Sequence, residues 1–245
     1  MTDYYPLNLE KIHPTWKACV QEALKQVDSE YLKQLTRSNQ WLPGPDKIFN
    51  AFTLPLDQVN YVLLGESPYP RKASANGYAF WDEAVTDLWS PSGLSKPINR
   101  ATSMRNIIKM LLITEGVSNP TQEIIAQLDK KKFIQSNPEL FNNLINHGFL
   151  LLNASLVLQE TPVQKDARAW QPFIKYVLEF LIQKRPQIHL ILFGKIANQI
   201  DALVDHAEIK RLYAEHPYNL SFITNPEVLS FFKPLKLLRT IANQR

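Results

Sequence analysis

The sequence predicts an α/β protein with a three-layer α/β/α arrangement around a central, mainly parallel four-stranded sheet. First, 245 residues with 45% hydrophobic content can bury a large core. Second, short apolar runs of strand length alternate with segments that have helical spacing. Third, the strand-length runs are continuously apolar, which is typical of strands buried on both faces. Parallel strands joined by helical crossovers satisfy all three observations.

Helices are indicated by the spacing of apolar residues. Three segments show it: residues 13–26, 104–113 and 173–182. In the first of them, Trp16, Val20 and Leu24 recur at helical intervals. Pro138 is expected to open a further helix, and Pro172 is expected in the first turn of the long helix that follows. A proline there loses nothing, because a first-turn N–H has no partner within the helix.

Strands are indicated by apolar runs that turn-forming residues bound. The runs cover residues 61–64, 149–152, 188–193 and, more weakly, 209–213. Gly65 follows the first run, Gly148 precedes the second and Gly194 follows the third. Residues 82–99 are expected to form a long loop. Because no repeat and no linker divides the chain, we expect a single domain over residues 1–245.

Composition narrows the class of protein. A single cysteine, Cys19, excludes an intramolecular disulfide and a cysteine-rich zinc site. Residues 1–10 lack the pattern of a secretory signal, and no apolar run approaches the ~20 residues of a membrane span. We therefore expect a cytoplasmic protein, nucleoid-associated in a bacterium, with no membrane partner. The net charge of +4 agrees with a polyanionic partner, whereas the basic run 130–132 is interpreted as a solvated helix end.

Polar residues follow three of the predicted strands. Ligands of open parallel sheets bind at the carboxyl ends of the strands. The segments at these ends are residues 65–70, 153–155 and 216–221. They carry a carboxylate, an amide and an imidazole, a set that suits a heterocycle with alternating donors and acceptors.

Five motifs in this chain resemble those of the uracil-DNA glycosylases and follow the family's order. The similarity as a whole runs from about Trp41 to Phe232. GESPYP and the following GYAF resemble the water-activating loop and base-stacking segment GQDPYH…GLAFS. SMRNI resembles PPSLRNI, GFLLLN resembles GVLLLN, LFGK resembles LWG, and HPYNLS resembles HPSPLS. The matching segments are residues 65–70 with 77–80, 103–107, 148–153, 192–195 and 216–221.

This resemblance implies a uracil-DNA glycosylase-like fold and a base-binding pocket. A glycosylase must flip its nucleotide out of the stack to reach the glycosidic bond. By resemblance, Phe80 would stack under the flipped uracil, Asn153 would read its edge, and Tyr69 would stand where a thymine methyl needs room. His216 would donate a hydrogen bond to the uracil oxygen as negative charge builds on the leaving base.

The resemblance also implies a DNA-binding set. Leu220 would fill the gap in the base stack. Ser103 and Ser221 would hold phosphates without reading the sequence, and Arg105 belongs to the same set. The expected partner is uracil-containing DNA, single- or double-stranded, bound by a monomer. No cofactor and no metal are expected, and the other histidines, including His206, have no metal-ligand spacing.

The catalytic set departs from the family pattern. Ser67 stands where the family has its water-activating aspartate, and a neutral hydroxyl supplies no negative charge for orienting water. Glu66, next to it, still offers a carboxylate, as GE does in related glycosylase branches. The catalytic candidates are therefore His216, Ser67 and Glu66.

The residues that face DNA in the family also differ. Pro70 replaces the last histidine of the PYH triplet, as in the poxvirus branch. Tyr218 and Asn219 replace a small Ser-Pro pair, and Arg71 with Lys72 replaces a glycine-rich turn. The extra bulk and charge are expected to alter how the strand is held.

Two readings therefore remain open. In the first, the chain is a DNA repair glycosylase that hydrolyses the N-glycosidic bond of uracil, or of a related damaged base, and leaves an abasic site. In the second, it is a catalytically impaired module that binds DNA or protein. The retained Phe80, Asn153 and His216 favour the enzyme, and Ser67 favours the module. Dinucleotide, P-loop, zincin and α/β-hydrolase motifs are absent from the sequence.

Overall fold

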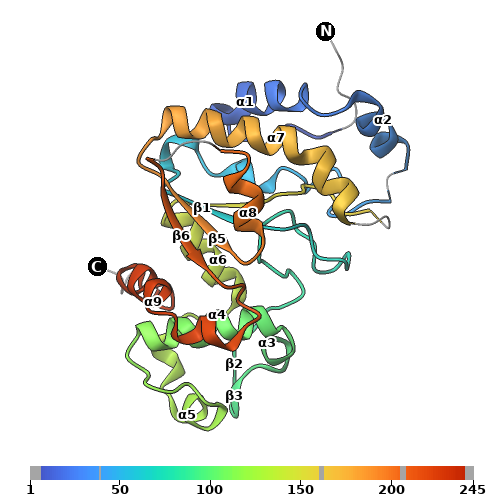
Figure 1. Cartoon of the computed structure of the whole chain (residues 1–245). Coiled ribbons are helices and arrows are strands. Elements are labelled where there is room, and N and C mark those ends of the chain that lie inside the picture. Colours follow the sequence, from blue (N-terminus) through green and yellow to red (C-terminus); the bar gives the residue numbers. More distant parts are fainter. Residues whose placement is uncertain (1–6, 39, 160–162, 205–207, 241–245) are drawn as a thin grey trace. The chain divides into compact units, whose positions relative to one another are not determined.

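The computed structural model describes residues 7–38, 40–159, 163–204 and 208–240 (Figure 1). His206 and residues 1–6, on which two sequence expectations depend, lie outside these ranges. Contacts group the chain into two compact units. Unit 1 comprises residues 1–82, 148–191 and 196–211, and unit 2 comprises residues 83–147, 192–195 and 212–245. The single domain over residues 1–245 stays a prediction.

A four-stranded sheet forms in the order β4-β1-β5-β6, flanked by helices. Its strands are β1 (Tyr61–Gly65), β4 (Phe149–Asn153), β5 (His189–Phe193) and β6 (Lys210–Ala214). β1 and β4 pair in parallel, with Tyr61 opposite Phe149 and Gly65 opposite Asn153. All five residues of β4 are buried, as a continuously apolar strand requires. The predicted α/β class and the four predicted strands are confirmed.

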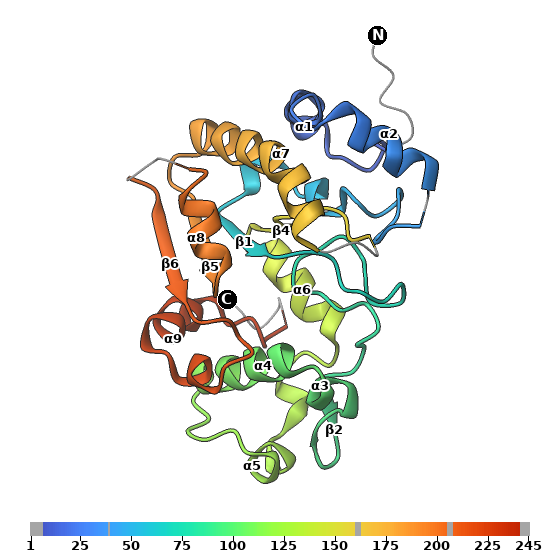
Figure 2. The same cartoon turned by 45° about the vertical axis from the view of Figure 1, so that its right-hand side comes forward.

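The helices of unit 1 pack around an aromatic cluster. They are α1 (Pro14–Leu24), α2 (Ser29–Ser38), α7 (Val163–Lys184) and α8 (Ile196–Asp201), with 3-10 turns η1 (Asn50–Thr53) and η2 (Leu56–Gln58). Trp16 of α1 packs edge-on against Phe52 at 5.2 Å between ring centroids, and Phe52 packs against Phe173 of α7 at 6.1 Å. Figure 2 shows α7 beside α1. The apolar residues that recur at helical spacing from Trp16 to Leu24 thus form the face of α1 that packs into this core.

The start of α7 corrects one prediction. Pro172 lies inside α7, which begins at Val163, and not in its first turn. A proline within a helix removes one hydrogen bond and costs about 3 kcal/mol. Trp170 and Phe173, which flank Pro172, are fully buried. Because packing of the buried face supplies most of the stability of a helix, the helix continues through the proline.

Unit 2 is mainly helical. Its elements are α3 (Lys96–Arg100), α4 (Thr102–Thr114), α5 (Gln122–Gln127), α6 (Asn137–Asn146) and α9 (Pro226–Phe232), the 3-10 turns η3 (Lys130–Lys132), η4 (Leu220–Thr224) and η5 (Lys233–Leu235), and the short strands β2 (Trp89–Ser90) and β3 (Gly93–Leu94). α6 begins as predicted, with Pro138 in its first turn and a capping box between Ser136 and Glu139.

The segment expected to be one long loop, residues 82–99, is in part regular. β2 and β3 form an antiparallel pair within it, and α3 starts at Lys96. Ser95 caps α3 by accepting a hydrogen bond from the Ile98 N–H. The strands are two residues long, too short for a period-2 pattern to be visible in the sequence.

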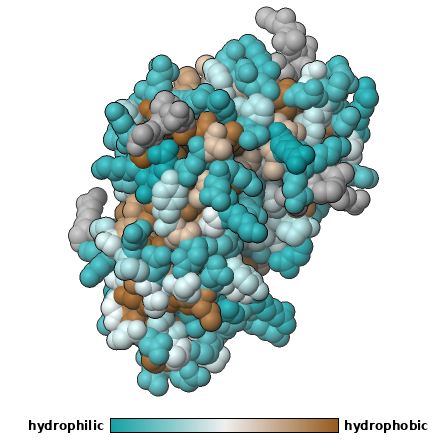
Figure 3. Space-filling model, in the orientation of Figure 1, coloured by the Kyte–Doolittle hydropathy of each residue, from teal (hydrophilic) through white to brown (hydrophobic). Residues whose placement is uncertain are grey.

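The surface of the face seen in Figure 3 is mostly hydrophilic, and its hydrophobic atoms form small separate patches. Among the described residues, no helix is both long and apolar enough to cross a membrane.

Candidate active site

The first group of predicted site residues lies in unit 1, at the carboxyl ends of β1 and β4. The parallel register places Gly65 opposite Asn153. Beyond the strands, the Ala154 N–H donates to the Gly65 carbonyl at 2.8 Å, and the Ser155 N–H donates to the Glu66 carbonyl at 2.9 Å. The loop after β1 and the chain after β4 are therefore joined, as expected for neighbouring parallel strands.

Asn153 occupies a confined position at this edge. Its side chain is buried, and its amide makes no hydrogen bond to another described residue. A Cβ atom at position 65 would lie 2.5 Å from the Asn153 Oδ1 and 3.0 Å from the Ala79 Cβ. Glycine at position 65 therefore makes room for the amide. An amide held in this way offers one acceptor and two donor hydrogens to a ligand.

Phe80 and Tyr69 are held next to each other in unit 1. The Tyr69 hydroxyl donates to the Phe80 carbonyl at 3.1 Å, and the Ala79 N–H donates to the Leu151 carbonyl of β4 at 3.1 Å. Phe80 has a φ of 63°, which is an outlier for a bulky residue. Such strained positions cluster at functional sites and persist only where the surroundings hold them.

An ion pair adds a second connection between the segment that carries Tyr69 and the segment that carries Phe80. Arg71 Nη2 lies 3.1 Å from Oδ2 of Asp82, whose side chain is buried while that of Arg71 is exposed. Burial, followed by the nearby charge of Asp82, raises the pKa of the Tyr69 phenol. The phenol therefore stays protonated near neutral pH and remains a hydrogen-bond donor.

The catalytic candidates of unit 1 lie in the same loop. Glu66 is exposed, and Ser67 is half-buried. The Ser67 hydroxyl contacts the Pro68 carbonyl at 3.5 Å, which is at the limit for a hydrogen bond. Unit 1 thus brings together Glu66, Ser67, Tyr69, Phe80 and Asn153.

The second group lies in unit 2, where the orientation of His216 is fixed by its surroundings. The Tyr218 N–H donates to His216 Nδ1 at 3.1 Å. When the ring is neutral, its hydrogen is therefore on Nε2, which acts as a donor. Gly194, at a φ of 72°, leaves room for the His216 side chain, because a Cβ at position 194 would lie 2.9 Å from the His216 Cβ.

Asn106 of α4 holds the loop that follows His216. The Asn106 side chain is fully buried, and its Nδ2 donates to the carbonyls of Pro217 at 2.8 Å, Tyr218 at 3.3 Å and Asn219 at 3.4 Å. Sequence reasoning gave Asn106 no role. A polar residue on the apolar face of a predicted helix was the available signal, because a buried N–H donor needs a hydrogen-bond acceptor.

The DNA-binding candidates of unit 2 lie on this loop and on α4. Leu220 is 72% exposed, and Ser221 is also exposed. Hydrogen bonds from Ser221 and Asn225 lower the pKa of Glu215, with Ser221 the larger cause. Unit 2 therefore carries a fixed carboxylate beside the exposed loop.

The α4 candidates are half-buried and belong to a basic stretch. Ser103 and Arg105 are both half-buried, and Arg105 Nη1 donates to the Asn99 carbonyl at 2.9 Å. Burial and the charge of Arg105 lower the pKa of Lys109, one turn further along α4. Two cations thus lie on one side of this helix, which suits contact with phosphates.

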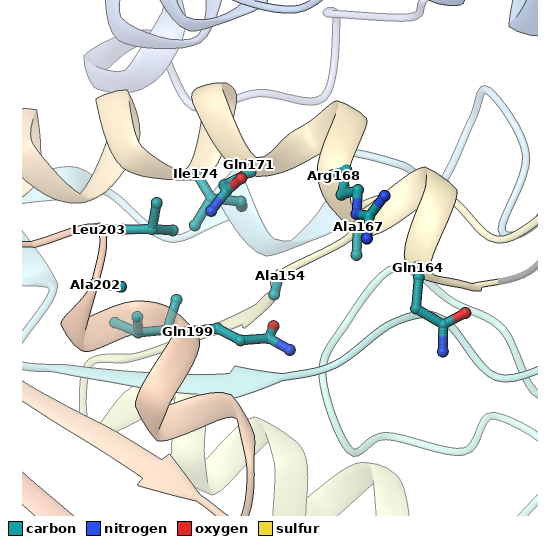
Figure 4. Close-up of a pocket in the computed structure, with 10 residues that line it drawn as sticks. Ala154, Gln164, Ala167, Arg168, Gln171, Ile174, Gln199, Ala202 and Leu203 are labelled. Atoms are coloured by element: carbon teal, nitrogen blue, oxygen red, sulfur yellow. The ribbon is translucent and has the colours of Figure 1, made fainter.

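A cavity that the sequence did not indicate lies in unit 1 between α7 and α8 (Figure 4). Its volume is about 290 Å³. Ala154, Ile174 and Ile200 line it, together with polar side chains such as Arg168 and Gln199. None of the predicted site residues lines this cavity. The described residues contain no group of three or more His, Cys, Asp or Glu side chains arranged to hold a metal ion.

Comparisons with known proteins give a consistent family. No family model matches the chain. The wild-type UNG crystal structure from Nitratifractor salsuginis superimposes with a TM-score of 0.89 at 36% sequence identity, covering 94% of each chain. The uracil-DNA glycosylase of Exiguobacterium sibiricum is 30% identical over 217 residues, or 86% of each chain. That of Amoebophilus asiaticus is 27% identical over 84% of each chain.

A mimivirus uracil-DNA glycosylase shares the fold, with a TM-score of 0.60 at 18% identity. The agreement at 36% identity extends over 94% of this chain. The chain therefore belongs to the uracil-DNA glycosylase family.

Proposed function

We propose that this chain is a DNA repair hydrolase that excises uracil from DNA. It acts on a flipped deoxyuridine, breaks the N-glycosidic bond with water and leaves an abasic site. Family membership supports this function. The observation that carries it is the hydrogen bond from the Tyr218 N–H to His216 Nδ1, because it leaves a donor on Nε2 for the leaving base.

Base recognition is assigned to the unit 1 group. Phe80 stacks on the uracil ring, and the confined Asn153 amide donates to one position of the uracil edge and accepts from another. At this edge cytosine has a donor where uracil has an acceptor, and an acceptor where uracil has a donor. Cytosine therefore leaves the amide unpaired, and its binding is strongly disfavoured. Tyr69, fixed by its bond to the Phe80 carbonyl, blocks the position of a thymine methyl.

Bond cleavage is assigned to His216, Glu66 and Ser67. As the bond stretches, negative charge builds on the uracil oxygen, and the His216 Nε2–H stabilises it. The sugar gains positive charge and needs a nearby carboxylate and an oriented water. Since Ser67 is neutral, Glu66 supplies that charge, and the Ser67 hydroxyl helps to orient the water.

DNA contact is assigned to Ser103, Arg105, Leu220 and Ser221. Ser103, Arg105 and Ser221 bind phosphates, and exposed Leu220 fills the gap left by the flipped nucleotide. Because Ser221 hydrogen-bonds to Glu215, its backbone N–H is the better phosphate donor. The protein acts as a monomer in the cytoplasm, and in a bacterium it associates with the nucleoid.

The test uses a labelled oligonucleotide with one deoxyuridine, single- and double-stranded, followed by alkaline cleavage of abasic sites. Wild-type protein is expected to excise uracil, and His216→Ala is expected to lose about 100- to 1000-fold in rate, the effect of removing a donor to a developing oxyanion. Glu66→Gln, which keeps the shape and removes the charge, is expected to lose activity. Ser67→Asp is expected to gain little.

A different pattern would support the binding-module reading. In that case the wild type binds uracil-containing DNA without excision, and activity emerges in Ser67→Asp. Excision that Glu66→Gln leaves unchanged would instead remove Glu66 from the mechanism while leaving the activity in place.

A further inference from the structure

Exposed hydrophobic side chains concentrate on one stretch of unit 2. Among the described residues, the large exposed hydrophobic side chains are Ile124 at 37%, Tyr213 at 45%, Tyr218 at 65% and Leu220 at 72%. Three of these four lie between positions 213 and 220, and the two most exposed are separated by one residue. Tyr218 and Leu220 therefore form an apolar pair on the loop that carries His216.

The backbone under this pair is held firmly. The Asn219 N–H donates to the His216 carbonyl at 2.9 Å, so residues 216–219 form a hydrogen-bonded turn. Asn106 donates to the carbonyls of Tyr218 and Asn219 from below. After Leu220, the fully buried Phe222 packs edge-on against Phe193 at 5.0 Å. Tyr218 thus lies in a fixed turn, and Leu220 follows that turn as the first residue of η4.

We propose that Tyr218 is a second DNA wedge, whose ring stacks on a base next to the gap that Leu220 fills. This inference rests on the proposed function. Aromatic rings stack on any base, because every base has a π face. A tyrosine that is already held on a rigid turn has only two side-chain torsions to order on binding. Stacking removes an exposed ring from water without breaking a contact of the loop.

The position of Tyr218 identifies DNA as the occupant. Tyr218 lies two residues after His216 and two before Leu220, so a ligand that covers its ring also covers the loop. A protein bound there permanently would block His216 from the substrate. DNA is the ligand that must approach His216 and Leu220 in every reaction cycle.

The backbone of Tyr218 separates its binding role from catalysis. The bond to His216 Nδ1 comes from the Tyr218 N–H and not from its ring. Any residue except proline keeps that bond. Replacing the ring is therefore expected to act mainly on KM for duplex substrate, with a smaller effect on kcat.

The experiment measures binding to a fluorescein-labelled duplex with one abasic site, together with KM and kcat on the deoxyuridine duplex. Tyr218→Ser is expected to weaken binding by roughly 5- to 100-fold, the range for loss of one base–aromatic stack. Tyr218→Phe keeps the ring and is expected to match the wild type. Ile124→Ser, an exposed apolar position on α5, is the control and is also expected to match it.

Other results would overturn either the second wedge, the proposed function or both. If Tyr218→Ser binds like the wild type while Leu220→Ala loses affinity, the second wedge is wrong and the proposed function stands. A fall in kcat at constant KM would also overturn the wedge, since the ring would then act through His216. If no uracil is excised but Tyr218→Ser still loses affinity for abasic DNA, the wedge stands and excision fails. A wild type without affinity for either DNA overturns both.

Discussion

At the carboxyl end of β1, the absent side chain of Gly65 decides where the Asn153 amide can lie. The φ of Gly65 is not in the left-handed region, so alanine would fit the backbone. Its Cβ, however, would lie 2.5 Å from the Asn153 Oδ1. The glycine is needed for space and not for conformation.

Gly65→Ala is therefore expected to displace the Asn153 amide and to lower uracil excision by about 100-fold, as a shift of about 1 Å does in an active site. Overpacking is expected to destabilise the fold by only about 1–3 kcal/mol. Excision assays with thermal unfolding test this. In an Asn153→Ala background the same change should add little, because the two residues interact directly. Additive losses would show that Gly65 acts elsewhere.

Phe80 adopts a backbone conformation that is unusual for a phenylalanine. Its φ of 63° is unfavourable for any side chain with a Cβ, by roughly 1–2 kcal/mol. The Tyr69 hydroxyl donates to the Phe80 carbonyl, and the neighbouring Ala79 N–H donates to the Leu151 carbonyl of β4. These contacts hold a ring that is only half-buried.

Phe80→Gly is expected to be more stable than Phe80→Ala by about 1 kcal/mol, because glycine adopts this φ without strain. Both variants lose the ring, so both are expected to lose excision. Urea unfolding measures the difference. Ala79→Gly, at a position without a positive φ, is the matched control and should destabilise the protein by roughly 0.5–1 kcal/mol. Equal stability of the two Phe80 variants would contradict the strain.

At the scale of elements, Glu215 connects the end of β6 to η4 and α9. Its carboxylate accepts a hydrogen bond from the Asn225 Nδ2 at 3.0 Å, and Asn225 also caps α9 through Oδ1. Hydrogen bonds from Ser221 and Asn225 lower the pKa of Glu215 below its ordinary value of 4.5. A lowered carboxyl pKa stabilises the fold above pH 4.5 and ceases to do so as the pH falls through the folded value.

Glu215→Gln is expected to lower the free energy of unfolding at pH 7, and this difference from the wild type is expected to shrink as the pH falls below 4.5. Urea unfolding of both proteins across this range gives the measurement. Glu227→Gln is the control. Glu227 lies in the first turn of α9, which Asn225 caps, but it accepts no hydrogen bond from Ser221. A difference that stays constant with pH would mean that Glu215 contributes by packing and not by charge.

At the scale of the whole molecule, the expected single domain and the two compact units make different predictions about unfolding. Strands β5 and β6 each contain residues of both units. Cys19 in α1 reports on unit 1. It is 1% exposed, and burial raises the pKa of its thiol to about 12, which makes it unreactive in the folded protein.

Cys19 labelling and amide exchange in α4 of unit 2 are expected to show the same urea midpoint, as one cooperative transition requires. Labelling is measured with a thiol reagent, and exchange by mass spectrometry. Two separated midpoints would show that the units unfold independently and that the chain has two domains.

The sequence by itself determined the α/β class, the four strands and the family. A continuous apolar run such as the one over β4 is compatible with few structures other than a strand buried on both faces. The order of the motifs from residue 65 to residue 221 carried the family resemblance. The resemblance also named the candidate site residues, whose roles stay predictions. Local patterns were sufficient to predict these features, because each buried strand and each motif is a short run of consecutive residues.

Tertiary structure alone decided the start of α7, the regular elements within residues 82–99 and the contacts that orient the site. Pro172 lies inside a helix because buried neighbours outweigh its lost hydrogen bond. The Asn106 amide reaches carbonyls 111 to 113 positions away, and the Gly194 space is defined by His216. Such contacts join residues distant in sequence, so no local pattern encodes them, and packing decides which of them form.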